Sequence, residues 1–189
     1  MIQMFTYGHP VLRNMAGPVR DVDKNVRKMA DGLVEFMLER HGVGLAAPQV
    51  GESVRIFSVF VPPRYDCSEA DGRRLNPEIN EPLVMINPVL TTETGVQNGE
   101  EGCLSIPGVF APVRRAYEVA VSFIDLRGRR RQLTVKGLVA RAVQHELDHL
   151  NGVLFVDRVS PLKKISLAAR LRRMKRAAER EIAGADIGG

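Results

Sequence analysis

The sequence predicts an α+β fold, in which short antiparallel strands pack around a central helix and a further helix lies near the C-terminus. Apolar residues recur at helical spacing in 22–40, and Gly137 releases the chain into the central helix over 138–150. Alternating apolar and polar residues in 117–125 and 131–135 predict two strands of a hairpin. Strands and helices do not alternate along the chain, so a parallel sheet is not expected.

The first predicted element is a helix that opens at Val22-Asp23 and runs to about Arg40. Its apolar residues recur at the spacing of one buried stripe, formed by Val26, Met29, Leu33, Phe36 and Met37. Gly42 and Gly44 then end the helix and begin an extended stretch. The stripe indicates a helix that packs one face against the core.

Strands and a loop are expected after this helix. Residues 54–61 are rich in branched and aromatic side chains and predict a strand. Residues 64–82 are polar and contain Asp71-Gly72 and Asn76-Pro77, so we expect a surface loop there. A short strand is expected at 83–86.

The second half of the chain leads into the central helix. The predicted hairpin turns at Arg127-Gly128. The central helix over 138–150 is followed by Gly152, which stands where a left-handed residue would end it. A basic helical extension is expected beyond it, over about 161–183.

Length and composition fit a single domain of residues 1–189. A chain of 189 residues with 44% hydrophobic residues is long enough for one well-buried core and short for two. No apolar run approaches about 18 residues and no charged-then-apolar leader is seen, so we expect neither a membrane span nor a signal peptide. Two cysteines are not a disulfide framework, which favours a reducing compartment and hence the cytoplasm.

The most informative feature is the pentad His145-Glu146-Leu147-Asp148-His149, an H-E-x-x-H pattern on the central helix. Residues four apart on a helix share a face, so His145 and His149 can bind one metal ion. The carboxylate of Glu146, between them, can then reach a water molecule at the metal and accept its proton. The pattern is typical of a metal-dependent hydrolase.

A third metal ligand must come from outside this stretch of the chain. Phe155 stands where a metzincin would place its third histidine, and no acidic residue lies between Asp157 and Glu179. The remaining histidines and cysteines are His9, His41, Cys67 and Cys103.

Sequence context favours Cys103 among these four. It lies within 100–108, where glycine and proline on both sides hold the backbone in a fixed bend, whereas Cys67 lies in a polar loop. A Cys-His-His set leaves one coordination position open, which is typical of catalytic rather than structural metal sites.

Three motifs stand in order along the chain: GVGLAAPQ at 42–49, EGCLSIPG at 101–108 and QHELDHLNG at 144–152. Together they resemble the signature motifs of bacterial peptide deformylases, the enzymes that remove the N-formyl group from new proteins. The resemblance covers roughly residues 5–165. It implies a hydrolase that acts on the formylated initiator methionine of nascent chains and N-formylmethionyl peptides, and that releases formate.

The resemblance also assigns roles around the metal. It implies one divalent ion bound by Cys103, His145 and His149, which is ferrous iron in cells, with zinc, nickel or cobalt as substitutes. The ligand types alone do not choose among these metals. Glu146 would carry the proton, and the oxygen that gains charge would accept hydrogen bonds from the Gln49 side chain and the backbone N–H of Leu104.

Substrate contacts are expected from two places. Counting back from His145 along the helix, the residues on the same face are Leu138, Arg141 and Ala142. The resemblance implies that this pocket receives the methionine side chain. Arg141 is expected to line it with its aliphatic stem while its charge reaches solvent. By resemblance, an extended peptide would pair with the main chain of Val43, Gly44 and Gly102.

Positive charge concentrates in the C-terminal extension. From Pro161 onward there are eight Lys or Arg residues against three acidic ones, which accounts for the net charge of +5 of the whole chain. A basic helix there could contact ribosomal RNA, and no contact with DNA is expected. The alternative is a solvated helix that docks through Leu162, Ile165, Ala169 and Met174.

Two other functions are compatible with the pentad. One is a different metallohydrolase, such as a peptidase, which would cleave unformylated peptides. The other is a non-catalytic, metal-stabilised RNA-binding module. The open coordination position and Gln49 argue against this module.

Overall fold

The computed structural model describes residues 2–68 and 70–186, and it confirms the predicted α+β class. An antiparallel five-stranded sheet has the order β1 (Gly44–Ala46), β2 (Ile56–Val59), β3 (Leu83–Thr94), β6 (Glu118–Ile124) and β7 (Arg130–Lys136). A separate antiparallel ribbon consists of β4 (Gln97–Cys103) and β5 (Ile106–Arg115). The helices are α1 (Lys24–Glu39), α2 (Gly137–Leu150), α3 (Phe155–Arg158) and α4 (Pro161–Asp186). Short 3₁₀ helices are η1 (Pro10–Arg13), η2 (Ala47–Val50) and η3 (Pro63–Tyr65).

Helix α1 forms where the apolar stripe predicts it. The side chain of Asp23 caps its start by accepting the N–H of Val26 at 2.8 Å. The buried face consists of Ala30, Leu33, Phe36 and Met37. At its end His41 adopts a left-handed backbone conformation with φ +54°, and the chain turns directly into β1. This short connection brings Val43 and Gly44 beside α2.

The structure corrects two strand boundaries. The strand predicted at 54–61 is only β2, four residues long. The strand predicted at 83–86 continues as β3 to Thr94, although Pro88 interrupts its hydrogen bonding. Asn87 has φ +50°, and the register between β3 and β6 shifts between Ile86 and Val89. This bulge accommodates the proline and lets the strand continue.

The β4–β5 ribbon was not predicted at all. The expected fixed bend at 100–108 is instead the end of this hairpin, with Cys103 paired to Ile106. One face of β5 is buried in alternation, through Ile106, Val109, Ala111, Val113 and Arg115. Glycines and prolines in the ribbon suggest chain breaks when they are read locally, which explains the omission.

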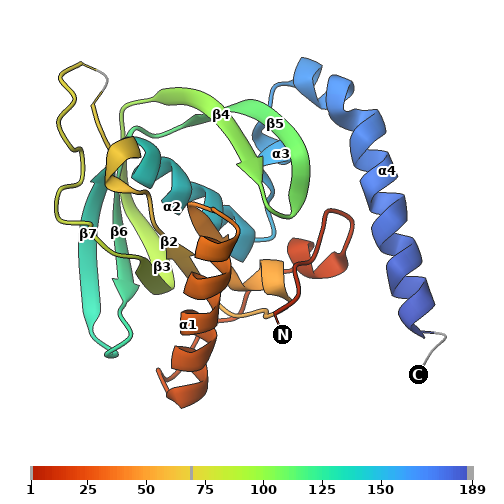
Figure 1. The fold of residues 1–189 in the computed structure, drawn as a ribbon, viewed down its shortest axis with the longest axis horizontal. Helices are drawn as coiled ribbons and strands as arrows, with labels where there is room; N and C mark the ends of the chain where they lie inside the picture. Colours follow the sequence, from red (N-terminus) through yellow and green to blue (C-terminus); the bar gives the residue numbers. More distant parts are fainter. Residues whose placement is uncertain (1, 69, 187–189) are drawn as a thin grey trace.

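Helix α2 lies between the sheet and the ribbon, and it runs through the middle of the molecule (Figure 1). On the sheet side, its residues Val139, Ala140 and Val143 join a cluster with Phe57, Met85 and Val121. On the other side, β5 and α3 form a second apolar cluster. Because both sides are covered, the polar residues of α2 are held in the interior.

Helix α4 packs along one side of the molecule through residues other than those predicted (Figure 1). Leu162 and Ile165 are 79% and 74% exposed, and Ala169 is also exposed, so these three expected docking residues are wrong. Leu167, Leu171 and Met174 pack against the second cluster, and Ala178 is buried. Only Met174 was predicted correctly.

Within 2–68 and 70–186, no helix has the length and apolar character needed to cross a membrane.

Candidate metal centre

Helix α2 places the pentad in the interior. His145, Glu146 and His149 are each less than 10% exposed. Their spacing on the helix turns the two imidazole rings toward each other, with ring centroids 5.0 Å apart. Phe155, at the position where a metzincin has its third histidine, stacks on His145.

The end of β4 brings Cys103 to these two histidines. The potential ligand atoms of Cys103, His145 and His149 all lie within 4.8 Å of one another. The Cys103 Sγ is 3.3 Å from the His149 Nε2. Of the other candidates, the His9 Nδ1 accepts the N–H of Val11, the Cys67 thiol donates to the Pro63 carbonyl, and His41 lines the cavity described below without joining the group.

The donor set fits a divalent cation. The His145 Nδ1 lies 2.9 Å from a Glu101 oxygen, which leaves its other nitrogen to face the cluster. Burial lowers the pKa of His145, but the contacts with Cys103 and Glu101 outweigh this effect and raise the pKa well above its usual value. Burial and the positive charges of His145 and Arg115 hold the pKa of His149 well below its usual value. The group therefore attracts one positive charge, and a cation would replace the proton on His145.

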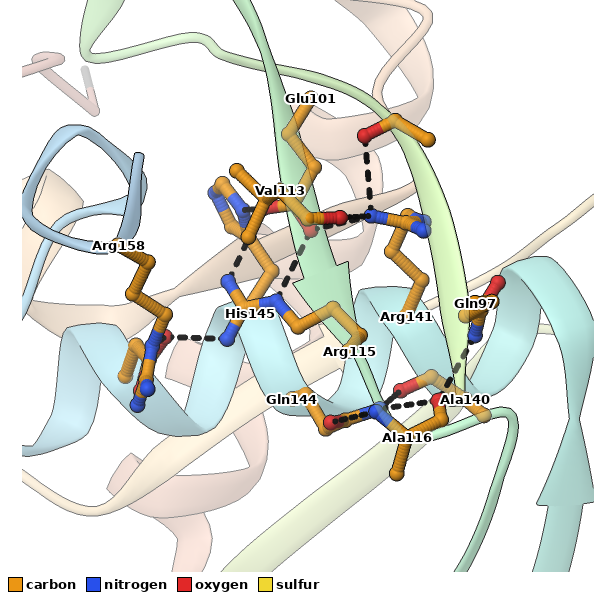
Figure 2. A network of polar contacts seen from close by, with 12 residues as sticks. Gln97, Glu101, Val113, Arg115, Ala116, Ala140, Arg141, Gln144, His145 and Arg158 are labelled. Carbon is orange, nitrogen blue, oxygen red and sulfur yellow. Dashed lines mark hydrogen bonds and ion pairs between the residues drawn. The ribbon is translucent and has the colours of Figure 1, made fainter. Parts of the chain in front are cut away.

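Glu101 is the centre of a buried network of charges that sequence reasoning missed. Figure 2 shows it contacting Arg115, Arg141 and His145. Burial raises the pKa of Glu101, but hydrogen bonds with His145 and Arg115 outweigh this effect and bring the pKa to about 2. Arg115 continues the network to Asp148, which also binds Arg158. The chain of contacts fixes the ring of His145 from behind.

Arg141 is buried, which corrects the expectation that its charge reaches solvent. It is 6% exposed, and its Nη1 donates to Glu101 at 2.8 Å. The same nitrogen donates to the carbonyls of Gly99 and Val113 at 3.2 and 3.0 Å. The carboxylate and the two carbonyls offset the cost of removing a guanidinium from water. Its side chain still lines the cavity described below.

Glu146 has a free acceptor in the interior. Its Oε2 is buried and has no hydrogen-bond partner among the described residues. Burial raises the pKa of Glu146 to about 7. Gly44 lies so close that a Cβ atom on it would stand 2.3 Å from the Glu146 Oε1. The motif glycine at 44 is therefore required by the position of this carboxylate.

The side chain of Gln49 is held in one orientation on η2. Its Oε1 accepts the N–H of Ala46 at 2.8 Å. Its Nε2 therefore points toward Cys103 Sγ at 3.4 Å and Ser105 Oγ at 3.2 Å. This geometry places an amide N–H donor beside the three potential ligands.

A cavity of about 540 Å³ opens in front of this group. Of the site residues predicted from the sequence, all except His149 line it, namely Val43, Gly44, Gln49, Gly102, Cys103, Leu104, Leu138, Arg141, Ala142, His145 and Glu146. Phe110 and Glu101 also line it and were not predicted. A larger hollow of about 690 Å³ on the opposite face of α2 contains none of the three potential ligands. Size alone therefore does not identify the site.

Known proteins resemble this chain over most of its length. Residues 1–165 match the family model described as polypeptide deformylase. The peptide deformylase of Alkalilimnicola ehrlichii is 38% identical over 184 residues, which cover 97% of this chain and 96% of that protein. The peptide deformylase of Nitrosococcus oceani is 38% identical over 176 residues, 93% of this chain and 97% of that protein.

Solved structures agree with these relatives. The crystal structure of peptide deformylase from Thermus thermophilus superposes with a TM-score of 0.78 at 37% identity, covering 93% of this chain and 98% of that one. The peptide deformylase from Thermotoga maritima gives a TM-score of 0.73 at 38% identity, covering 85% and 99%.

Proposed function

The chain belongs to the polypeptide deformylase family, whose members are metal-dependent hydrolases that remove the N-formyl group from newly made polypeptides, and we propose which of its residues perform this reaction. This membership sets aside the peptidase and the RNA-binding module. One observation carries the proposal: three potential metal ligands meet beside a buried oxygen of Glu146 that has no hydrogen-bond partner in the part of the chain that the structure describes. Cys103, His145 and His149 are the proposed ligands.

Glu146 is the proposed proton carrier. A divalent ion held by the three ligands would polarise the formyl carbonyl and lower the pKa of the attacking water from about 15.7 toward about 7. Glu146 accepts the proton of this water and then delivers it to the amine nitrogen, which would be a poor leaving group as an anion. Burial raises the pKa of Glu146, which favours its acceptance of the proton from the attacking water.

Gln49 and Leu104 are the proposed donors to the formyl oxygen. The N–H of Ala46 orients the Gln49 amide so that its Nε2 donates toward Cys103 and Ser105, and a formyl oxygen bound here would accept one of these two N–H groups. The backbone N–H of Leu104, next to the proposed ligand, is the second donor. Fixed donors of this kind stabilise the charge that develops in the transition state, each by about 2.7–4 kcal/mol.

The cavity supplies the proposed peptide contacts. Leu138 and Ala142 form an apolar wall for the methionine side chain, and the guanidinium of Arg141 is held against Glu101 at the same wall. Val43, Gly44 and Gly102 offer main-chain groups to an extended substrate. Contacts of this type read the backbone, so we expect tolerance after the first residue.

Replacing Gly44 by alanine is expected to lower kcat/KM by about 100-fold, the typical cost of misplacing a catalytic group by 1 Å. The new methyl group would stand 2.3 Å from the Glu146 Oε1, so the carboxylate must move. Formate release from formyl-Met-Ala-Ser measures the effect. Gly17→Ala is the control, because its Cβ would meet only ordinary contact at 3.7 Å. Equal rates in the two variants would contradict the assignment of Glu146.

Ferrous iron is the proposed metal in cells, with zinc, nickel or cobalt as substitutes. The mixed thiolate and imidazole set suits all of these metals, so the choice of iron rests on the family.

Cys103→Ala is expected to abolish stoichiometric metal binding and formate release, because the third ligand is lost. Elemental analysis of anaerobically purified protein should find iron in the parent chain and in Cys67→Ala, the matched control. Cys67 lies outside the group, where its thiol contacts the Pro63 carbonyl. Full metal content in Cys103→Ala would remove Cys103 from the ligand set. Activity toward formyl-Met-Ala-Ser but not its unformylated twin tests the reaction itself.

Two coarser proposals complete the description. Residues 1–189 are proposed to form a single catalytic domain with a basic C-terminal helical extension. The enzyme is proposed to act in the cytoplasm on nascent chains, because its substrates are newly made polypeptides.

Contact between α4 and the ribosome is also proposed, because most basic side chains of the helix are exposed while Leu167, Leu171 and Met174 pack against the second cluster. Deleting the helix would uncover that cluster, so charge removal is the cleaner test. Arg172→Gln combined with Arg176→Gln is expected to reduce cosedimentation with ribosomes at low salt. Arg73→Gln combined with Arg114→Gln removes the same charge from exposed sites elsewhere. Equal cosedimentation of both double variants would end the proposal.

A further inference from the structure

The turn between β6 and β7 carries an exposed cluster of arginines that the proposed function does not use. Arg127, Arg129, Arg130 and Arg131 are all exposed. Within the described residues, the carboxylate that pairs with the cluster is Asp125, which lies 3.2 Å from Arg129 and 3.7 Å from Arg131. Arg127 and Arg130 form no ion pair with any residue that the structure describes. Four cations against one anion leave a local excess of three positive charges.

This turn, here called the arginine tip (residues 125–131), is held rigidly. The Asp125 side chain accepts the backbone N–H groups of Arg127 and Arg129, each at 2.9 Å. Gly128 has φ +77° and closes the turn. The tip is anchored at one end of the molecule beside the start of α1, where Arg27 donates to the Leu126 carbonyl at 3.1 Å (Figure 1). Ile124 and Leu126 pack against the core beneath it.

The net charge of the segment 1–160 does not reveal the arginine tip. This segment contains equal numbers of basic and acidic residues, so all net charge falls in the C-terminal extension. The four arginines of the tip nevertheless stand within the five consecutive residues 127–131, and they concentrate positive charge at this one end of the sheet. Charges fixed on a rigid turn attract a polyanion more strongly than the same charges spread over a surface.

The chemistry of the arginine tip favours phosphate groups. The exposed residues 127–132 are arginine, glycine and glutamine, so no aromatic or apolar side chain is offered for base stacking or for insertion into a membrane. A guanidinium matches the geometry of a phosphate with paired donors. The contact would therefore read a phosphate backbone rather than bases.

The positive charge of the arginine tip is complementary to a phosphate backbone. Arg131 lies opposite Phe123 in the β6–β7 ladder and Arg130 lies opposite Ile124, so these neighbouring arginines point to opposite sides of the turn. A nucleic acid carries a phosphate at every nucleotide, so its backbone offers several anions to arginines that point in different directions. We propose that the arginine tip is an RNA-binding surface, separate from α4, that contacts the phosphates of RNA near the nascent chain.

The test uses the full-length metal-loaded enzyme and a short double-stranded RNA labelled for fluorescence anisotropy. Arg127→Gln combined with Arg130→Gln removes two charges that make no ion pair within residues 2–68 and 70–186. Its plot of log affinity against log salt should be shallower than that of the parent by about 1.4–1.8, because each lost phosphate contact removes about 0.7–0.9. Formate release from a short formylated peptide should be unchanged, since no tip residue lines the cavity.

Three controls make the result decisive. Arg73→Gln combined with Arg114→Gln has the same net charge, and an equal loss of RNA binding in this variant would overturn the proposal. So would a double variant of the tip that binds RNA with the parental salt slope. Vesicles containing phosphatidylserine should bind the parent and the tip variant alike, and a selective loss of vesicle binding would assign the tip to membranes. The α4 double variant should keep the contribution of the tip, which separates this proposal from the ribosome contact of α4.

Discussion

Glu146→Gln is expected to lower kcat for formyl-Met-Ala-Ser by about 10²- to 10⁴-fold, the range for loss of a positioned proton carrier. Glutamine has nearly the same shape as glutamate but cannot accept the proton of the attacking water. The neighbouring Gly44 leaves room for a side chain of this size, so the local packing should survive. The rate of formate release by purified, metal-loaded protein measures the change.

Metal content separates this explanation from damage to the site. Glu146 is not among the three potential ligands, so Glu146→Gln should retain the parental amount of metal. Glu179→Gln, on the exposed face of α4, is the control and should behave as the parent. Two results would reject the role of Glu146: undiminished turnover, or a loss of turnover that merely follows a loss of metal.

The elements that could be predicted from the sequence are those whose signals are local. Helix α1 carries a complete apolar stripe and a capping aspartate, and the β6–β7 hairpin has alternation on both sides of a glycine turn. The β4–β5 ribbon lacks such signals, because Pro107 and Pro112 suggest breaks and its buried face makes sense only beside α3. Its existence depends on contacts between distant segments, which periodicity does not report.

The same distinction applies to the candidate site. The two histidines and Glu146 lie within one pentad, so their proximity follows from helical spacing. The proximity of Cys103 had to be inferred from its context and its motif. Arg141 could not be placed from the sequence, because a buried arginine needs partners and Glu101 is 40 residues away. Glu101 itself stood inside a motif, but nothing local indicated the cations around it.

Arg115→Met is expected to lower the free energy of unfolding by about 3–5 kcal/mol, the cost of leaving buried charges without a partner. The Arg115 side chain is 3% exposed and bonds to both Glu101 and Asp148. Urea unfolding of metal-free protein measures the effect without a contribution from the metal. Arg114→Met is the matched control, because the neighbouring side chain is exposed and forms no ion pair within the described residues. It should change stability by no more than about 0.5 kcal/mol.

Remaining partners limit the size of this loss. Glu101 keeps Arg141 and His145, and Asp148 keeps Arg158, so the lower end of the range is expected. A loss of unfolding free energy as small as that of Arg114→Met would mean that these partners compensate fully. In the metal-loaded protein, weaker support of His145 should also reduce metal affinity by about 10- to 100-fold.

At acid pH, the difference in the free energy of unfolding between the parent and Arg115→Met should become smaller. The pKa of Glu101 falls from its usual 4.5 to about 2 in the folded parent, so the unfolded chain binds more protons between these values. The stability that this carboxylate contributes is therefore complete above pH 4.5 and is lost as the pH falls toward 2. Without Arg115, the pKa of Glu101 in the folded variant is lowered less. The free energy of unfolding of the variant therefore falls less over the same pH window. If this difference in the free energy of unfolding stays constant from neutral pH down to the acid end of the window, Arg115 acts through packing rather than through its charge.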